Sequence, residues 1–205
     1  MQIFGQMARV PVTARQKFNE AGYFYNGMLA QRTNVIVFPY YLSAFLSAFR
    51  SVTFFLQKQY SNNAEFKSWY AQKVAVVIAD PVLAMLAKKR TAAVHLEPID
   101  LFFTQSFQMP ARYGGSITTK QFELVQDQEP GGQLKTTIKV DADGVAEEVP
   151  PVMIWHFTEE DRDDLAKHCY HGLESLDSIL TELEGLRASM GLVSDPDASD
   201  FPSAE

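Results

Sequence analysis

Cysteine is almost absent from this chain, which has Cys169 as its one thiol among 205 residues. A disulfide-stapled fold is therefore excluded, and a reducing compartment, the cytoplasm, is expected. Proline and glycine are also sparse, at 10 and 11 residues, which excludes a collagen-like chain. The hydrophobic share of 46% is that of a globular protein with its own core.

Long apolar runs are missing as well. The nearest candidate, residues 33–49, is uncharged, but it contains Asn34, Pro39 and Ser47 and stops at Arg50. We expect this segment to be a buried helix, with a membrane span as the alternative. The first residues lack the basic stretch and apolar run of a secretion signal. No membrane association is expected.

Acidic side chains are scarce in the first half of the chain. Residues 1–95 hold 3 Asp and Glu against 11 Lys and Arg, a net charge of +8. Residues 96–190 carry −11 and residues 191–205 carry −4, so the whole chain has a charge of −7. A basic half attracts phosphate groups and an acidic half repels them. The two interpretations are a phosphate-binding half and an unevenly charged surface.

Apolar residues recur at helical spacing in the first part of the chain. Thr13 is a candidate cap for the first helix, and Pro39 suits the start of the second. Asp80-Pro81 predicts a break, because Asp caps helices and Pro fits a first turn. The predicted helices cover residues 13–30, about 39–60, 64–79 and 81–92.

Beyond Pro98 the period changes from about 3.6 to 2, which predicts strands. Candidate strands cover residues 117–125, 133–140 and 145–154, with turn sequences between them, so a small antiparallel meander is expected. A last helix is expected to start at Thr158-Glu159-Glu160-Asp161 and to end near Gly191.

These patterns predict a mainly α protein, α+β overall. The expected organisation is an up-and-down helical bundle with a small β meander inserted before the last helix. The predicted units are a bundle at 1–98, the meander at 99–156, a helix packing on the bundle at 157–190 and a disordered acidic tail at 191–205.

Several familiar catalytic motifs are absent. The chain has no G-x-x-x-x-G-K, G-x-G-x-x-G, G-x-S-x-G or H-E-x-x-H sequence. Cys169 lies among leucines at helical spacing, so we expect a buried, inert thiol. Asp164, His168 and His171 share one helical face, but no second ligand cluster exists, so ordinary histidines are favoured over a metal site. No metal and no cofactor are expected.

The most informative cluster is a run of basic side chains, Lys88, Lys89, Arg90 and His95, at the end of the fourth predicted helix. One interpretation is a basic helix end that complements the helix dipole; the other is a phosphate site. Arg50 is a further cation, in an otherwise apolar helix. It either reaches solvent from the flank of its helix or faces a cleft that holds an anion.

The R-x4-H spacing of Arg90 and His95, after a helix containing LSAFRSVTFFLQK and a following FKSWY, resembles the HEPN (higher eukaryotes and prokaryotes nucleotide-binding) superfamily. More narrowly, the chain resembles a largely uncharacterised bacterial branch in which the helical bundle carries extra elements. The resemblance covers residues 13–95, with the last helix as a further candidate, and the meander lies outside it. It differs at Thr91, where the family commonly has Asn, Asp or His, so the resemblance leaves catalytic activity open.

The resemblance implies a homodimer that binds RNA and cleaves it without a metal. Arg90 would hold the scissile phosphate, and His95 would act as acid or base toward the ribose 2′-OH or the leaving oxygen. Lys88, Lys89 and Arg50 would add nucleic-acid contacts. Five helical steps separate Arg90 and His95 by roughly 140°, so either the helix ends near Thr91 or two subunits combine their residues.

Three functional hypotheses follow. The first is RNA binding or metal-independent endoribonuclease activity by a HEPN-like homodimer. The second is a non-catalytic interaction module that binds a protein partner, which the net acidity favours. The third, a small-molecule enzyme, depends only on the abundant aromatic residues, such as Tyr23, Tyr25 and Tyr40, and aromatic stripes usually belong to a core.

Overall fold

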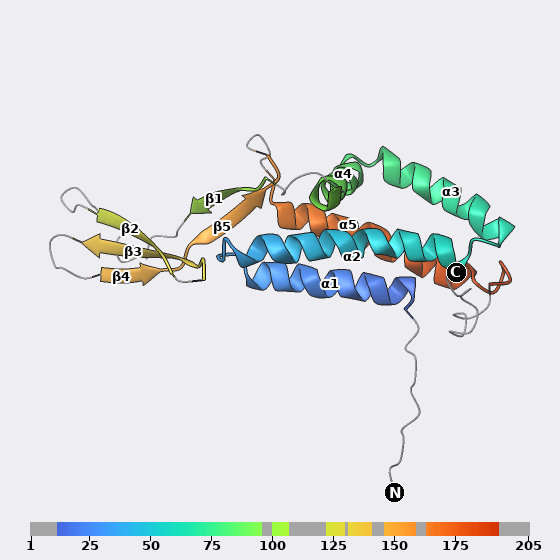
Figure 1. Ribbon diagram of the computed structural model, residues 1–205, viewed down its shortest axis with the longest axis horizontal. Coiled ribbons are helices and arrows are strands. Elements are labelled where there is room, and N and C mark those ends of the chain that lie inside the picture. Colours follow the sequence, from blue (N-terminus) through green and yellow to red (C-terminus); the bar gives the residue numbers. More distant parts are fainter. Residues whose placement is uncertain are drawn as a thin grey trace, which may run out of the picture.

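The computed structural model describes residues 12–95, 100–106, 122–129, 131–140, 146–158 and 163–192. Within these ranges the chain forms five helices and five strands (Figure 1). The helices are α1 (Ala14–Ala30), α2 (Val37–Gln59), α3 (Ala64–Ala79), α4 (Pro81–His95) and α5 (Leu165–Leu186). The strands are β1 (Phe102–Ser106), β2 (Phe122–Gln128), β3 (Leu134–Val140), β4 (Ala146–Val149) and β5 (Val152–His156).

The predicted fold class, mainly α with a small antiparallel β part before the last helix, is confirmed. Helices α1, α2 and α5 run side by side along the long axis of the molecule, and the strands extend from one end of them (Figure 1). The core forms where these three helices meet. Its fully buried large side chains include Phe38, Leu42, Phe45, Leu46 and Leu165.

Helix α1 begins where the capping signal predicts. The Thr13 hydroxyl accepts a hydrogen bond from the Gln16 backbone N–H, and the Gln16 side chain accepts one from the Thr13 N–H. This reciprocal capping box satisfies two backbone donors that the helix itself leaves unpaired. The cap fixes the point at which the chain enters the bundle.

The apolar segment at residues 33–49 is a core helix, as expected. Its stripe continues into Val52 and Leu56, which are fully buried. In the described part of the chain, no single helix has the length and hydropathy of a membrane span. The pair formed by α3 and residues 81–91, bent by 90°, meets those two criteria jointly.

The break at Asp80-Pro81 turns the chain sharply between α3 and α4. Asp80 Oδ1 accepts hydrogen bonds from the backbone N–H groups of Val82 and Leu83, at 2.8 and 3.1 Å, and so caps α4. The backbone of α3 comes close to that of α4, whereas α3 reaches α5 mainly through long side chains. One face of α3 is consequently open.

The β part differs from the prediction of one meander. Strands β2, β3 and β4 form one antiparallel sheet, and β1 pairs with β5 in a second. The predicted strand at 145–154 is two strands, because Pro150-Pro151 cannot donate ladder hydrogen bonds and separates β4 from β5. Strand β1 was not predicted, and residues 117–121 lie outside the described residues.

An aromatic stack and a backbone hydrogen bond join the strands to the bundle. The ring of Trp155 in β5 lies parallel to that of Phe38 in α2, with centroids 4.2 Å apart, and its indole N–H donates to the Arg32 carbonyl at 2.8 Å. In the α1–α2 loop, the Val35 N–H donates to the Gly132 carbonyl at 2.9 Å. The strands therefore join the end of the bundle at two points.

The last helix starts later than predicted. Its cap is Asp164, whose side chain accepts from the Ala166 N–H, rather than Thr158. Residues 159–162 and the predicted disordered tail from residue 193 onward lie outside the described residues. The helix also ends earlier than Gly191, at Leu186, and turns follow it.

Candidate functional site

Helix α4 carries the basic cluster and runs without interruption from Pro81 to His95. This excludes the first of the two alternatives, in which the helix ends near Thr91 and the chain turns His95 back. Positions five residues apart on one helix differ in direction by roughly 140°, so Arg90 and His95 lie on different faces of α4. The side chain of His95 is not among those described. Arg90 and His95 can therefore share a site only if the two residues come from two copies of the chain.

Arg90 is half-buried, and its Nε is a buried donor without an acceptor. Among the described residues no carboxylate forms an ion pair with Arg90, whereas Arg15 pairs with both Asp177 and Glu184. Because the buried Nε is out of reach of an external anion, the terminal N–H groups of this unpaired guanidinium are the donors that a phosphate would meet.

Lys88 and Lys89 have different surroundings. Lys88 is exposed. The Lys89 ammonium donates to the Phe157 carbonyl at 3.0 Å and lies 5.2 Å from the centroid of the Phe157 ring. Lys89 therefore ties α4 to the segment after β5, and of the two lysines Lys88 is the better placed to meet a phosphate.

Arg50 is exposed on α2, and its guanidinium donates to the hydroxyl of Thr53, one turn further along the helix. This position agrees with an arginine that reaches solvent from the flank of its helix. No contact in the described part of the chain joins Arg50 to the α4 cluster.

The three residues considered as metal ligands, Asp164, His168 and His171, each contact a different partner. Asp164 pairs with Arg32, and His171 donates from Nε2 to Asp80 at 2.7 Å. The His168 ring stacks on Phe157. Across the residues the structure describes, no three His, Cys, Asp or Glu side chains are arranged to hold a metal ion.

Two further reactive side chains, Cys169 and His156, are enclosed in the fold. Cys169 is fully buried, and burial raises the pKa of its thiol far above the ordinary value. His156 is buried too, with one ring nitrogen 3.0 Å from the Asp163 carbonyl and the other 3.1 Å from the Thr104 hydroxyl. Both side chains therefore have structural roles in this fold.

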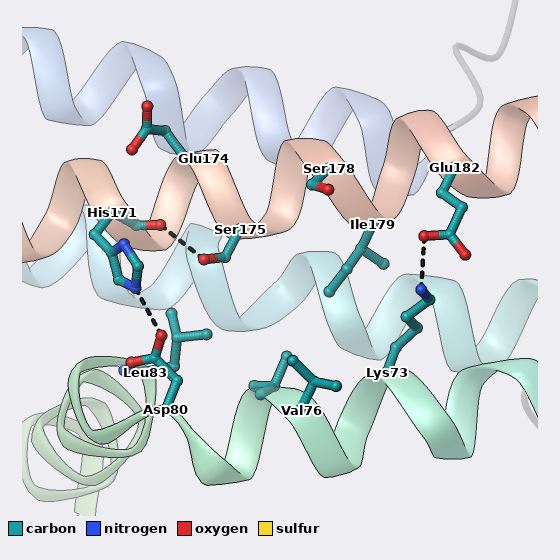
Figure 2. Close-up of a pocket in the computed structure, with 11 residues that line it drawn as sticks. Lys73, Val76, Asp80, Leu83, His171, Glu174, Ser175, Ser178, Ile179 and Glu182 are labelled. Atoms are coloured by element: carbon teal, nitrogen blue, oxygen red, sulfur yellow. Dashed lines mark hydrogen bonds and ion pairs between the residues drawn. The ribbon is translucent and has the colours of Figure 1, made fainter.

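A groove between α3 and α5 is the feature that the sequence did not predict (Figure 2). Its volume is about 420 Å³. The apolar part of its wall is formed by Val76 and Val77 of α3, Leu83 of α4 and Ile179 of α5. Ser175 and Ser178 of α5 add two hydroxyl groups.

A pair of polar side chains bridges the two walls at each end of the groove, as Figure 2 shows. At one end His171 bonds to Asp80, and at the other Lys73 lies 2.6 Å from Glu182. The hydrogen bond from His171 lowers the pKa of Asp80, and that from Lys73 lowers the pKa of Glu182. Glu174 lies on the α5 rim and has no ion-pair partner among the described residues.

The polar spacing along α5 was the available signal for this groove. His171, Ser175, Ser178 and Glu182 recur at helical spacing and mark one polar face. A polar helix face usually borders bulk solvent. Only the placement of α3 opposite this face makes it the side of a groove.

Comparisons with protein families, with curated proteins and with solved structures gave no match to this chain.

Proposed function

We propose that the chain is an RNA-binding protein of HEPN-like character that acts as a homodimer and cleaves RNA without a metal. The observation that supports this most is the state of Arg90, a half-buried guanidinium without a carboxylate partner in the described part of the chain. Arginine binds phosphate through two parallel N–H donors, and low local dielectric strengthens that contact. Exposed Lys88, two residues away, adds attraction to a polyanion.

The continuity of α4 makes a second copy necessary to this proposal. A single helix directs positions 90 and 95 to different faces, so a phosphate held by Arg90 is reached by the His95 of a twin molecule. A two-fold axis would form two equivalent sites, because in such an interface each copy contributes the same residues to its partner.

The chemical step is transphosphorylation. The ribose 2′-oxygen attacks the adjacent phosphorus, the O2′–P bond forms and the P–O5′ bond breaks. The products are a 2′,3′-cyclic phosphate and a 5′-hydroxyl. His95 takes the proton of the 2′-hydroxyl or gives one to the 5′-oxygen, for which an imidazole with an ordinary pKa of about 6.5 is suited. Arg90 stabilises the charge that develops on the phosphate oxygens.

The direct test uses a mixed-sequence RNA incubated with the protein in a chelator at low salt. Cleavage is expected, with loss of about 100-fold in rate for Arg90→Ala and for His95→Ala. Lys67→Ala is the matched control, because Lys67 is exposed on α3 and its replacement removes the same charge. A DNA strand of the same sequence should stay intact, because it lacks the 2′-hydroxyl that attacks the phosphorus. Failure to bind or cleave RNA, or equal rates for all variants, would reject the proposal and favour the non-catalytic interaction module.

A further inference from the structure

Helices α3 and α5 present complementary stripes to the groove that lies between them. On α3 the stripe contains Lys73, Val76, Val77 and Asp80, spaced i, i+3, i+4 and i+7. Figure 2 shows the facing residues of α5 along the same length. Stripes of this spacing are the surfaces by which helices pack on one another. Here they border a common groove.

We propose that this groove binds an amphipathic α-helix with basic flanks, supplied by a partner protein. Two helical walls with an apolar strip between them are the usual receptor for such a helix, whose i, i+3, i+4 and i+7 residues fill the groove. From His171 to Glu182 the groove follows α5 for about 16 Å, or three helical turns. That length suits the short recognition helices that bind in this mode.

The apolar strip indicates where the partner's hydrophobic residues lie. Val76 is 68% exposed although it borders the groove, and Val77, Leu83 and Ile179 complete the strip. A volume of about 420 Å³ accommodates a few aliphatic side chains. Covering these side chains removes their apolar surface from water, which favours binding.

The charge around the groove indicates which charge the flanking residues of the partner helix carry. Three carboxylates border the groove, those of Asp80, Glu174 and Glu182, against one lysine and one histidine. Lys73 and His171 already pair with two of the acids, so Glu174 offers an unpaired negative charge. The chain as a whole carries −7, which also favours encounter with a basic segment. The partner's helix therefore carries Lys or Arg beside its apolar stripe.

This inference is separate from the proposed RNA activity. The groove contains none of the residues of the basic α4 cluster. Substitutions on the groove should leave RNA cleavage unchanged, and loss of cleavage in the Arg90 variants should leave helix binding unchanged. The two proposals can therefore fail independently.

The test is a fluorescence-anisotropy titration of the full chain with a synthetic peptide of about 18 residues, leucines on one helical face and lysines on the other. We expect micromolar binding, weakened at least about tenfold by Val76→Lys and by Glu174→Lys. Ile78→Lys is the control for the first, because Ile78 is 69% exposed on the same helix and does not line the groove. Glu65→Lys, at the exposed start of α3, is the control for the second. Both controls should bind the peptide as the unaltered chain does.

Several results would overturn the inference. One is no binding, and another is equal binding of a scrambled peptide or of a peptide with glutamates in place of lysines. Equal loss in Val76→Lys and Ile78→Lys would indicate unspecific association. Binding of a peptide of residues 1–11 as tightly as the designed one would assign the groove to the chain itself. A dimer that dissociates in the Val76→Lys variant would assign it to a second copy.

Discussion

His171 Nε2 donates a hydrogen bond to Asp80 Oδ2 across 2.7 Å, and this pair joins α5 to the corner between α3 and α4. The other oxygen of the same carboxylate caps α4. Asp80 therefore has two separable functions, a helix cap and an ion-pair partner, and one substitution distinguishes them.

Asp80→Asn is expected to retain the cap, because asparagine caps helices well, and to lose the charged partner of His171. The free energy of unfolding should fall by about 0.5–1 kcal/mol at neutral pH. Asp80→Ala removes the cap as well and should cost about 1 kcal/mol more. Urea unfolding followed by circular dichroism measures both differences.

The effect of Asp80→Asn should depend on pH. The His171 hydrogen bond lowers the pKa of Asp80 in the folded chain below its ordinary value of about 3.9. The carboxylate thus contributes its full stabilisation above that ordinary value and loses it as the pH falls through the folded pKa. The gap between the two proteins should narrow below about pH 4. A gap that stays constant down to pH 3 would contradict this.

Lys88 and Lys89 form a matched pair for the basic cluster. Lys89→Met removes the hydrogen bond to the Phe157 carbonyl, so it should lower the free energy of unfolding by about 1 kcal/mol. Lys88→Met should leave stability unchanged and weaken RNA binding more, because Lys88 is exposed and Lys89 is already bonded. Thermal unfolding and RNA titration of both variants test this. The reverse ranking in RNA affinity would assign the phosphate contact to Lys89.

Gly131 and Gly132 form a second matched pair, in the turn before β3. Both have positive φ, at +104° and +80°. A Cβ on Gly132 would lie 2.7 Å from Cγ1 of Ile36, whereas nothing lies within 4 Å of one on Gly131. Gly131→Ala should cost about 1 kcal/mol for its backbone conformation alone, and Gly132→Ala clearly more. Equal losses in the free energy of unfolding for the two variants, measured with urea, would show that the Ile36 side chain moves aside without cost.

The helices could be predicted because each has its signal within its own residues. The periodicity of the third helix and the break after it gave Ala64–Ala79 with both ends correct. Strand β1 could not be predicted in the same way, because its partner is β5 and no turn sequence connects them. The start of α5 was misplaced because two acidic segments both resemble a cap, and only the contact of Asp164 with Ala166 shows which one acts.

The site could be predicted in part. The residue types and spacing of Arg90 and His95 are local and visible in the sequence. No local pattern in the sequence showed that α4 continues through His95. The groove depends on the distance between two helices that lie about 100 residues apart in the sequence. In the sequence, each of these two helix faces resembles an ordinary solvent-exposed surface.

We propose above that Arg90 of one copy and His95 of another form one site, and a mixture of two inactive variants distinguishes this pairing from a site within one copy. Arg90→Ala and His95→Ala proteins, each inactive alone, are combined in equal amounts under conditions that allow subunits to exchange. Half of the dimers are then mixed, and each mixed dimer contains one intact site. RNA cleavage should return to about a quarter of the wild-type rate. A mixture as inactive as its components, with subunit exchange verified, would contradict a site shared between two copies.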